Sequence, residues 1–149
     1  MRSPERLTVR ITRARAKNLE FACQAFTRIH GRKLKNSRVL IDFLTDSNCY
    51  LLLALEDDRV VGSLNGYRLR LPCIRRPAFL IYEIDVRAES QNRGVGKSLV
   101  RAFINEAKKA NAEEVWVLSN KSNVAAMAMY RACGFKRKNR DDVMLELPL

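Results

Sequence analysis

The sequence lacks the features that mark a metal site, a membrane span or a secreted protein. Its 149 residues include one histidine, His30, and four cysteines with no Cys-x-x-Cys pair, so zinc-type spacing is absent. No apolar run approaches the roughly 20 residues that cross a bilayer, and the polar N-terminus is unlike a secretory signal. We expect no metal, no membrane association and a cytoplasmic protein. In such a protein we expect the four cysteines to be reduced, mostly buried thiols. They are Cys23, Cys49, Cys73 and Cys133.

Internal repeats, low-complexity blocks and linkers rich in glycine or proline are also missing from the sequence. The apolar fraction of 47% and the charged fraction of 30% are those of an ordinary folded chain. A chain of this length can bury one core and is too short for two full ones. We therefore expect a single domain over residues 1–149.

Positive charge is plentiful: the net charge is +12 and the pI is about 10.1. A basic surface can attract a nucleotide cofactor, an acidic partner or nucleic acid, or it can simply keep the protein in solution. Aromatic residues make up only 7% of the chain and do not interleave with the basic ones, which gives base stacking little support. Nucleic acid is therefore not an expected partner.

The hydrophobic pattern alternates between strand and helix periods. The predicted strands are Leu7–Ile11, Cys49–Leu55, Val60–Leu71, Ala78–Val86 and Val115–Leu118, with two last strands at Phe135 and over Val143–Leu147; the predicted helices are about Arg15–Ile29, Ser37–Thr45, Gly94–Asn111 and Asn123–Cys133. In the second helix the spacing places Val39, Leu40, Phe43 and Leu44 inward. The continuous apolar run from Val115 indicates a buried strand. This order predicts an α/β chain with a mixed sheet.

The stretch from Gln91 to Ser98 connects a predicted strand to a predicted helix. Gly94 and Gly96 allow a sharp turn and a close approach to a ligand, and the helix that follows presents amides and partial positive charge, which suit phosphate. A dinucleotide fingerprint would need a third glycine where Leu99 stands, and a phosphate loop would need a glycine in place of Gln91. Neither of those two nucleotide-binding classes therefore fits.

Two motifs together resemble the GCN5-related N-acetyltransferase (GNAT) superfamily. The first is Gln91-x-x-Gly94-x-Gly96, and the second is Asn123-x-x-Ala126-x-x-x-Tyr130-x-x-x-Gly134-Phe135. The resemblance covers about residues 49–147. It implies a GNAT fold, which is a mixed, mostly antiparallel sheet splayed at its middle and flanked by about four helices. It also implies acetyl-CoA as cofactor, a small-molecule amine as substrate, and a possible homodimer formed through the C-terminal strands.

The resemblance assigns the site residues one by one. Glu83 stands in an apolar strand, where a carboxylate is costly unless it is paired or functional, and it is our candidate base for the attacking amine. Tyr130 matches the superfamily's proton donor to the leaving thiolate. Asp85 is either a second acid of the site or a residue that faces solvent or a partner. The implied cofactor-binding residues are Ile84, Asp85, Val86, Gln91, Asn92, Arg93, Gly94, Val95, Gly96, Lys97, Ser98, Asn123 and Tyr130.

The acceptor stays open between alternatives. The segment Asn48–Val95 is similar to the type I aminoglycoside 3-N-acetyltransferases, in which Ile-Tyr-Asp-Leu corresponds to the four residues starting at Ile81. The charge of +12 repels a polycation at long range, although a local acidic group can offset this, because charges beyond about 10 Å are screened. An N-acetyltransferase of a protein, a peptide or another small amine is a second possibility. Leu118 counts against the ribosomal-protein enzymes, because they carry glutamate at the matching position. A catalytically silent CoA-binding module is a third. The local acidic group comprises Glu83, Asp85, Asp141, Asp142 and Glu146.

Overall fold

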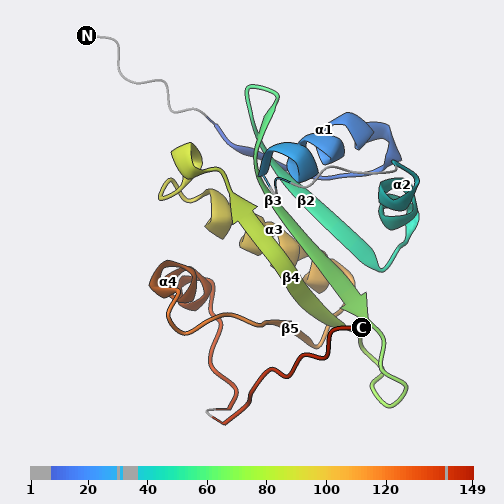
Figure 1. The fold of residues 1–149 in the computed structure, drawn as a ribbon. Helices are drawn as coiled ribbons and strands as arrows, with labels where there is room; N and C mark the ends of the chain where they lie inside the picture. The colour runs from blue at the N-terminus through green and yellow to red at the C-terminus, as the bar shows by residue number, and fades with distance from the viewer. Residues whose placement is uncertain (1–7, 30, 32–36, 140) are drawn as a thin grey trace.

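A five-stranded sheet lies at the centre of the computed structural model, which describes residues 8–29, 31, 37–139 and 141–149 (Figure 1). The strands lie in the order β1-β2-β3-β4-β5. Three successive pairs are antiparallel and the last, β4 with β5, is parallel. The prediction of a mixed, mostly antiparallel sheet is therefore confirmed. The strands are β1 Arg10–Arg13, β2 Cys49–Glu56, β3 Arg59–Leu69, β4 Ala78–Val86 and β5 Glu114–Val117.

Four helices flank the sheet, as predicted. Helices α1 and α2 cover one face, α3 crosses the other, and α4 packs against α3 (Figure 1). A 3-10 turn precedes α1 and a π-helical turn follows it, so the predicted helix over residues 15–29 is formed in three pieces. No helix in the described ranges has the length and apolarity of a membrane span. The helices are α1 Leu19–Gln24, α2 Ser37–Thr45, α3 Val95–Lys109 and α4 Val124–Ala132, with shorter turns over Ala16–Asn18, Ala25–Ile29 and Ala88–Ser90.

Each face of the sheet has its own hydrophobic core. On the α3 side, the fully buried rings of Phe79 and Phe103 lie 5.5 Å apart between centroids, and Tyr50 packs against both. On the α1/α2 side, Leu51 and Leu53 pack beneath the helices. Burying a side chain of this size contributes roughly 1.5–3 kcal/mol, so the alternation of β2 stabilises both layers at once.

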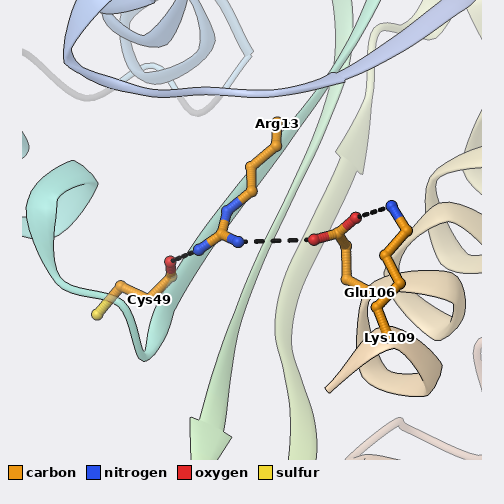
Figure 2. Close-up of polar contacts among 4 residues, drawn as sticks. All are labelled: Arg13, Cys49, Glu106 and Lys109. Carbon is orange, nitrogen blue, oxygen red and sulfur yellow. Dashed lines mark hydrogen bonds and ion pairs between the residues drawn. The ribbon is translucent and has the colours of Figure 1, made fainter. Parts of the chain in front are cut away.

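A polar cluster around Arg13 joins β1, β2 and α3 (Figure 2). The Arg13 guanidinium donates to the Cys49 carbonyl oxygen at 3.1 Å and lies 3.5 Å from a Glu106 carboxylate oxygen. Its Cζ lies 3.7 Å from the centroid of the Tyr50 ring, and Lys109 contacts the other Glu106 oxygen at 2.8 Å. The Arg13 and Glu106 side chains are only 18% and 22% exposed, so they gain from each other more than a surface pair would.

Replacing Arg13 by methionine should lower the free energy of unfolding by about 2–3 kcal/mol, because it leaves a largely buried carboxylate with less compensation. Urea unfolding measures the change. Arg10→Met is the matched control on the same strand: its partner Asp58 is 3.6 Å away and both side chains are exposed, so the cost should stay within about 0.5 kcal/mol. Equal costs for the two variants would contradict the role given to the cluster.

Two predicted burial patterns are wrong. Val39 is 68% exposed, because α2 turns Leu40 and Leu44 toward the sheet and Val39 lies on the outer side. Strand β5 is not a buried strand, since it forms one edge of the described sheet, and Trp116 and Leu118 are 36% and 61% exposed. The position of a strand within a sheet depends on long-range pairing, which a local apolar run does not encode.

The ends of the sheet also differ from the prediction. The first strand is Arg10–Arg13 rather than Leu7–Ile11, and Leu7 lies outside the described residues. The two last strands, at Phe135 and over Val143–Leu147, do not form in the described residues, where the chain after Gly134 is irregular. Val143, Leu145 and Leu147 are 78%, 88% and 81% exposed. The C-terminal strands from which a homodimer was expected are thus missing from the described structure.

The expectation that the thiols are mostly buried is also wrong. Cys23, Cys49 and Cys133 are half-buried, whereas Cys73 is exposed in the loop between β3 and β4. All four are unpaired thiols.

Candidate functional site

The glycine turn adopts the conformation that its sequence predicts. Asn92 and Gly94 both have left-handed backbone, with φ of 59° and 83°, and α3 begins at the next residue. Ser98 donates its amide to the Gly94 carbonyl at 3.0 Å. The preceding amides of the first turn have no acceptor within the helix and point out of its N-terminus. Such successive amides form an anion-binding concavity that is strengthened by the helix dipole.

Strand β4 extends beyond its parallel partner β5. The pairing runs from Ala78 opposite Glu114 to Ile81 opposite Val117, where β5 ends. From Tyr82 to Val86, β4 continues along β3 and has no partner strand on its other edge in the described residues. This edge includes the backbone of Ile84, Asp85 and Val86, and it can take an extended ligand by strand-like pairing.

Three elements meet at Gly96, in the first turn of α3. A Cβ added there would lie 2.9 Å from Met129 Sδ of α4, and 3.7 Å and 4.0 Å from side-chain atoms of Val86 and Ile84. A Cβ at this position would therefore clash with the Met129 side chain, whereas its distances to the two β4 side chains are ordinary van der Waals contacts. The turn, β4 and α4 thus meet around this glycine.

A β-bulge lies in β4 where the open edge begins. Gly66 pairs with Ile81 and Asn65 pairs with Glu83, so Tyr82 is an extra residue between them. Leu64 and Ile84 pack in the α3-side core. Their strand neighbours Asn65 and Glu83 therefore lie on the α1/α2 face, because successive side chains alternate. Asp85 lies opposite Ser63 on that same face.

The Glu83 carboxylate has a side-chain partner on β3. Asn65 Nδ2 donates to Glu83 Oε2 at 3.1 Å. Asn65 is 8% exposed, and Glu83 is intermediate in exposure. The strand therefore presents a partly accessible carboxylate that is held by a hydrogen bond from β3.

Aromatic rings line the strand next to Glu83. Tyr67 meets Tyr82 edge to face at 5.8 Å between centroids and meets Phe43 of α2 in the same way at 5.9 Å. Burial raises the pKa of the Tyr67 phenol, with smaller contributions from Cys49, Tyr82 and Glu83. Tyr82 is 68% exposed, so its ring can contact a ligand that reaches Glu83.

Tyr130 lies on α4 and belongs to the core on the α3 side. It is 6% exposed and packs against Phe135 at 5.6 Å between ring centroids. Burial, followed by the charge of Cys133, raises the pKa of the Tyr130 phenol above its ordinary value of 10. The phenol therefore keeps its proton at neutral pH, as a proton donor must.

Several predicted cofactor-binding side chains have structural partners. Gln91 Nε2 donates to the Val86 carbonyl at 3.0 Å and ties the turn to the end of β4. Arg93 forms a two-contact ion pair with Glu56, at 2.6 and 3.3 Å. Asn123 caps α4, accepting from the Ala126 amide at 3.1 Å. Of the other polar side chains in the turn, Lys97 is half-buried and Ser98 is exposed.

Sequence reasoning missed two features of the site. The first is Asn65. Nothing in the sequence around it indicates a contact with Glu83, because only the pairing register of β3 and β4 brings the two residues together. Beside the turn lies a surface hollow of about 490 Å³, in which Arg59, Arg87 and Arg93 gather with Glu56 and Glu89. Asp57 also lines the hollow, so its three arginines are balanced by three carboxylates, and Arg87 pairs with Glu89 at 2.9 Å.

Comparison with known proteins adds family evidence. Residues 16–135 match the model of the acetyltransferase (GNAT) family. Human N-acetyltransferase 8 is 25% identical over 101 residues, and the match covers 68% of this chain but only 44% of the human protein. The [ribosomal protein bS18]-alanine N-acetyltransferase of Escherichia coli K12 is 28% identical over 46% of this chain and 55% of its own. An aminoglycoside acetyltransferase from an uncultured soil metagenomic sample has a TM-score of 0.81 at 25% identity, over 95% of both chains.

Proposed function

Since the chain belongs to the acetyltransferase (GNAT) family, we propose that it transfers an acetyl group from acetyl-CoA to a primary amine. GNAT acetyltransferases use acetyl-CoA as the acetyl donor. One observation carries the proposal: β4 loses its partner strand at the bulge that holds Glu83, and farther along the open edge Ile84 and Val86 lie beside a helix N-terminus suited to phosphate.

The residues present fit this cofactor. The left-handed turn and the unpartnered amides of Val95, Gly96 and Lys97 suit its pyrophosphate, and the unpaired edge of β4 suits its amide-containing arm. The side chains of Gln91, Arg93 and Asn123 have other tasks, so we assign phosphate binding to the backbone and to the charge of Lys97. When bound, the cofactor supplies the activated acetyl group.

Glu83 is the proposed general base. A protonated amine cannot attack, so a carboxylate within hydrogen-bond reach must remove a proton from it. Glu83 presents its carboxylate on the α1/α2 face, while the unpaired edge of β4 lies in the plane of the sheet. This arrangement lets the amine and the cofactor approach from different directions.

Tyr130 is the proposed proton donor. Its phenol stays protonated at neutral pH. Tyr130 lies on α4 next to Met129, whose side chain lies close to Gly96 in the first turn of α3. A neutral phenol there can donate a proton to the leaving sulfur. Glu83 and Tyr130 thus act from opposite faces of the sheet.

We favour an aminoglycoside as the acceptor, without assigning which amino group reacts. The likeness to the soil aminoglycoside acetyltransferase spans nearly the whole chain. In addition, Glu83 and Asp85 lie two residues apart on one face, roughly 7 Å apart along the strand, a spacing at which they can bind two ammonium groups of one substrate. An N-terminal alanine of a ribosomal protein is the second candidate, supported by the E. coli relative.

A substrate panel tests the function. Thiol release from acetyl-CoA should appear with gentamicin- or kanamycin-type aminoglycosides and be weak with spermidine and with an alanyl peptide. Turnover of the peptide alone would replace the aminoglycoside by the second candidate. Binding of acetyl-CoA in calorimetry with no turnover across the panel would indicate a CoA-binding module instead.

We also propose that residues 1–149 form a single domain and that the protein works in a reducing compartment such as the cytoplasm. The family match crosses every strand except β1, which pairs with β2 in the same sheet. The four cysteines are unpaired thiols, as such a compartment would keep them.

A further inference from the structure

Strand β3 buries a polar side chain in contact with the proposed base. Asn65 is 8% exposed and lies directly opposite Glu83 at the bulge. Its Nδ2 donates to Glu83 Oε2 at 3.1 Å, across the two strands. A hydrogen bond to a charged acceptor is stronger than one between neutral groups, so this contact restrains the carboxylate.

The other end of the same amide has no partner. Asn65 Oδ1 is buried and accepts no hydrogen bond from any residue that the structure describes. A buried carbonyl oxygen without a donor destabilises the folded state, and an apolar residue of similar shape would avoid that cost. Stability therefore does not explain why an asparagine occupies this position. Residues that reduce stability in this way are common at functional sites.

We propose that Asn65 is a positioning residue that holds the Glu83 carboxylate in the orientation from which it accepts the proton of the amine. This inference rests on the proposed function, because it takes Glu83 as the base. The bulge makes the arrangement possible, since it places the extra residue Tyr82 beside Glu83 and shifts Glu83 into register with Asn65. A base must be held within a narrow range of positions, and rigid strands hold it better than loops.

The test is a double-mutant cycle between Asn65→Leu and Glu83→Gln. Asn65→Leu should lower kcat about 10- to 100-fold, which is the effect of losing one hydrogen bond to a charged group. The KM of the amine and the Kd of acetyl-CoA, measured by calorimetry, should change less than about threefold, and the Tm should not fall. In the Glu83→Gln background, Asn65→Leu should have little further effect on kcat, because its role runs through Glu83.

A second variant keeps the test sound if the leucine variant does not fold. Asn65→Asp has nearly the same shape but replaces the donor by a carboxylate that repels Glu83, so kcat should again fall at least about tenfold. Asn111→Asp, at an exposed position after α3, makes the same charge change away from the site and should leave kcat unchanged.

Several results would overturn the proposal. Additive effects of the two substitutions would mean that Asn65 acts independently of Glu83, and a fall in Tm with unchanged kcat would mean that its role is structural. A spectroscopic readout is independent of turnover: the side-chain amide resonance of Asn65 in 15N-labelled protein should shift in Glu83→Gln and stay in place in Glu113→Gln. If the wild type acetylates no amine, the proposed function fails. If the Asn65 amide resonance does not shift in Glu83→Gln, the hydrogen bond between the two residues is contradicted, whatever the function.

Discussion

Glu83→Gln should lower kcat by about 10²- to 10⁴-fold, the contribution of a positioned general base, and should leave the Kd of acetyl-CoA nearly unchanged. Glutamine keeps the size of the side chain and can still accept the hydrogen bond from Asn65 Nδ2, so the substitution removes the basicity and little else. Stopped-flow or steady-state thiol release measures kcat, and calorimetry measures cofactor binding.

Two further carboxylates make this result specific. Glu113→Gln is the matched control, because Glu113 pairs with Arg76 near the start of β5 and should have no effect on kcat. Asp85→Asn removes the next carboxylate on the same face of β4. If Asp85→Asn caused the larger loss in kcat and Glu83→Gln the smaller, the base would be Asp85. Full turnover in Glu83→Gln would contradict the assignment of Glu83 as the general base.

Gly66→Ala should be the most destabilising small substitution in the sheet, costing at least about 3 kcal/mol of unfolding free energy. A Cβ at Gly66 would lie 2.5 Å from the Leu80 carbonyl oxygen and 2.5 Å from Phe103 Cζ. The first is backbone of the neighbouring strand, and the second belongs to a fully buried ring wedged against Tyr50 and Phe79. Neither can move without disturbing the sheet.

Gly62→Ala is the matched control four residues earlier on the same strand. There the added Cβ would meet its nearest atoms at 3.1 to 3.2 Å, two of them side-chain atoms that can shift by a few tenths of an ångström. We expect a cost of about 1 kcal/mol for this variant. Urea unfolding of both proteins separates the two cases, and a Gly66→Ala protein as stable as Gly62→Ala would contradict the packing described around Phe103.

The sequence predicted those parts of the fold that local pattern determines. Helix α2 has the predicted bounds, and the hairpin of β2 and β3 differs from the prediction only at its ends, because periodicity and turn residues are local signals. Strand β5 forms within one residue of its predicted bounds, but its burial and the strands of the C-terminal segment were predicted wrongly, for the opposite reason. An apolar run becomes a buried strand only when the sheet offers it a neighbour on both sides, which depends on the whole chain.

The candidate site divides in the same way. The turn at Gly94 could be predicted directly, since glycine between a strand and a helix permits the left-handed backbone that a sharp turn requires. Asn65 could not be, because its contact with Glu83 depends on the pairing register of β3 and β4. The assignments of Glu83 and Tyr130 stay predictions that await the kinetic tests.

The bulge at Tyr82 has a consequence for what mutation can do to this strand. Before it, the β4 residues that pack in the α3-side core carry odd numbers, Phe79 and Ile81; after it they carry even numbers, Ile84 and Val86. In the first half of the strand the odd-numbered residues therefore face α3, and in the second half the even-numbered ones do. The extra residue Tyr82 causes the change. Inserting or deleting one residue within either half would turn the side chains beyond that point to the opposite face of the sheet. The alternation changes only at the bulge, and the residue that follows the bulge is Glu83.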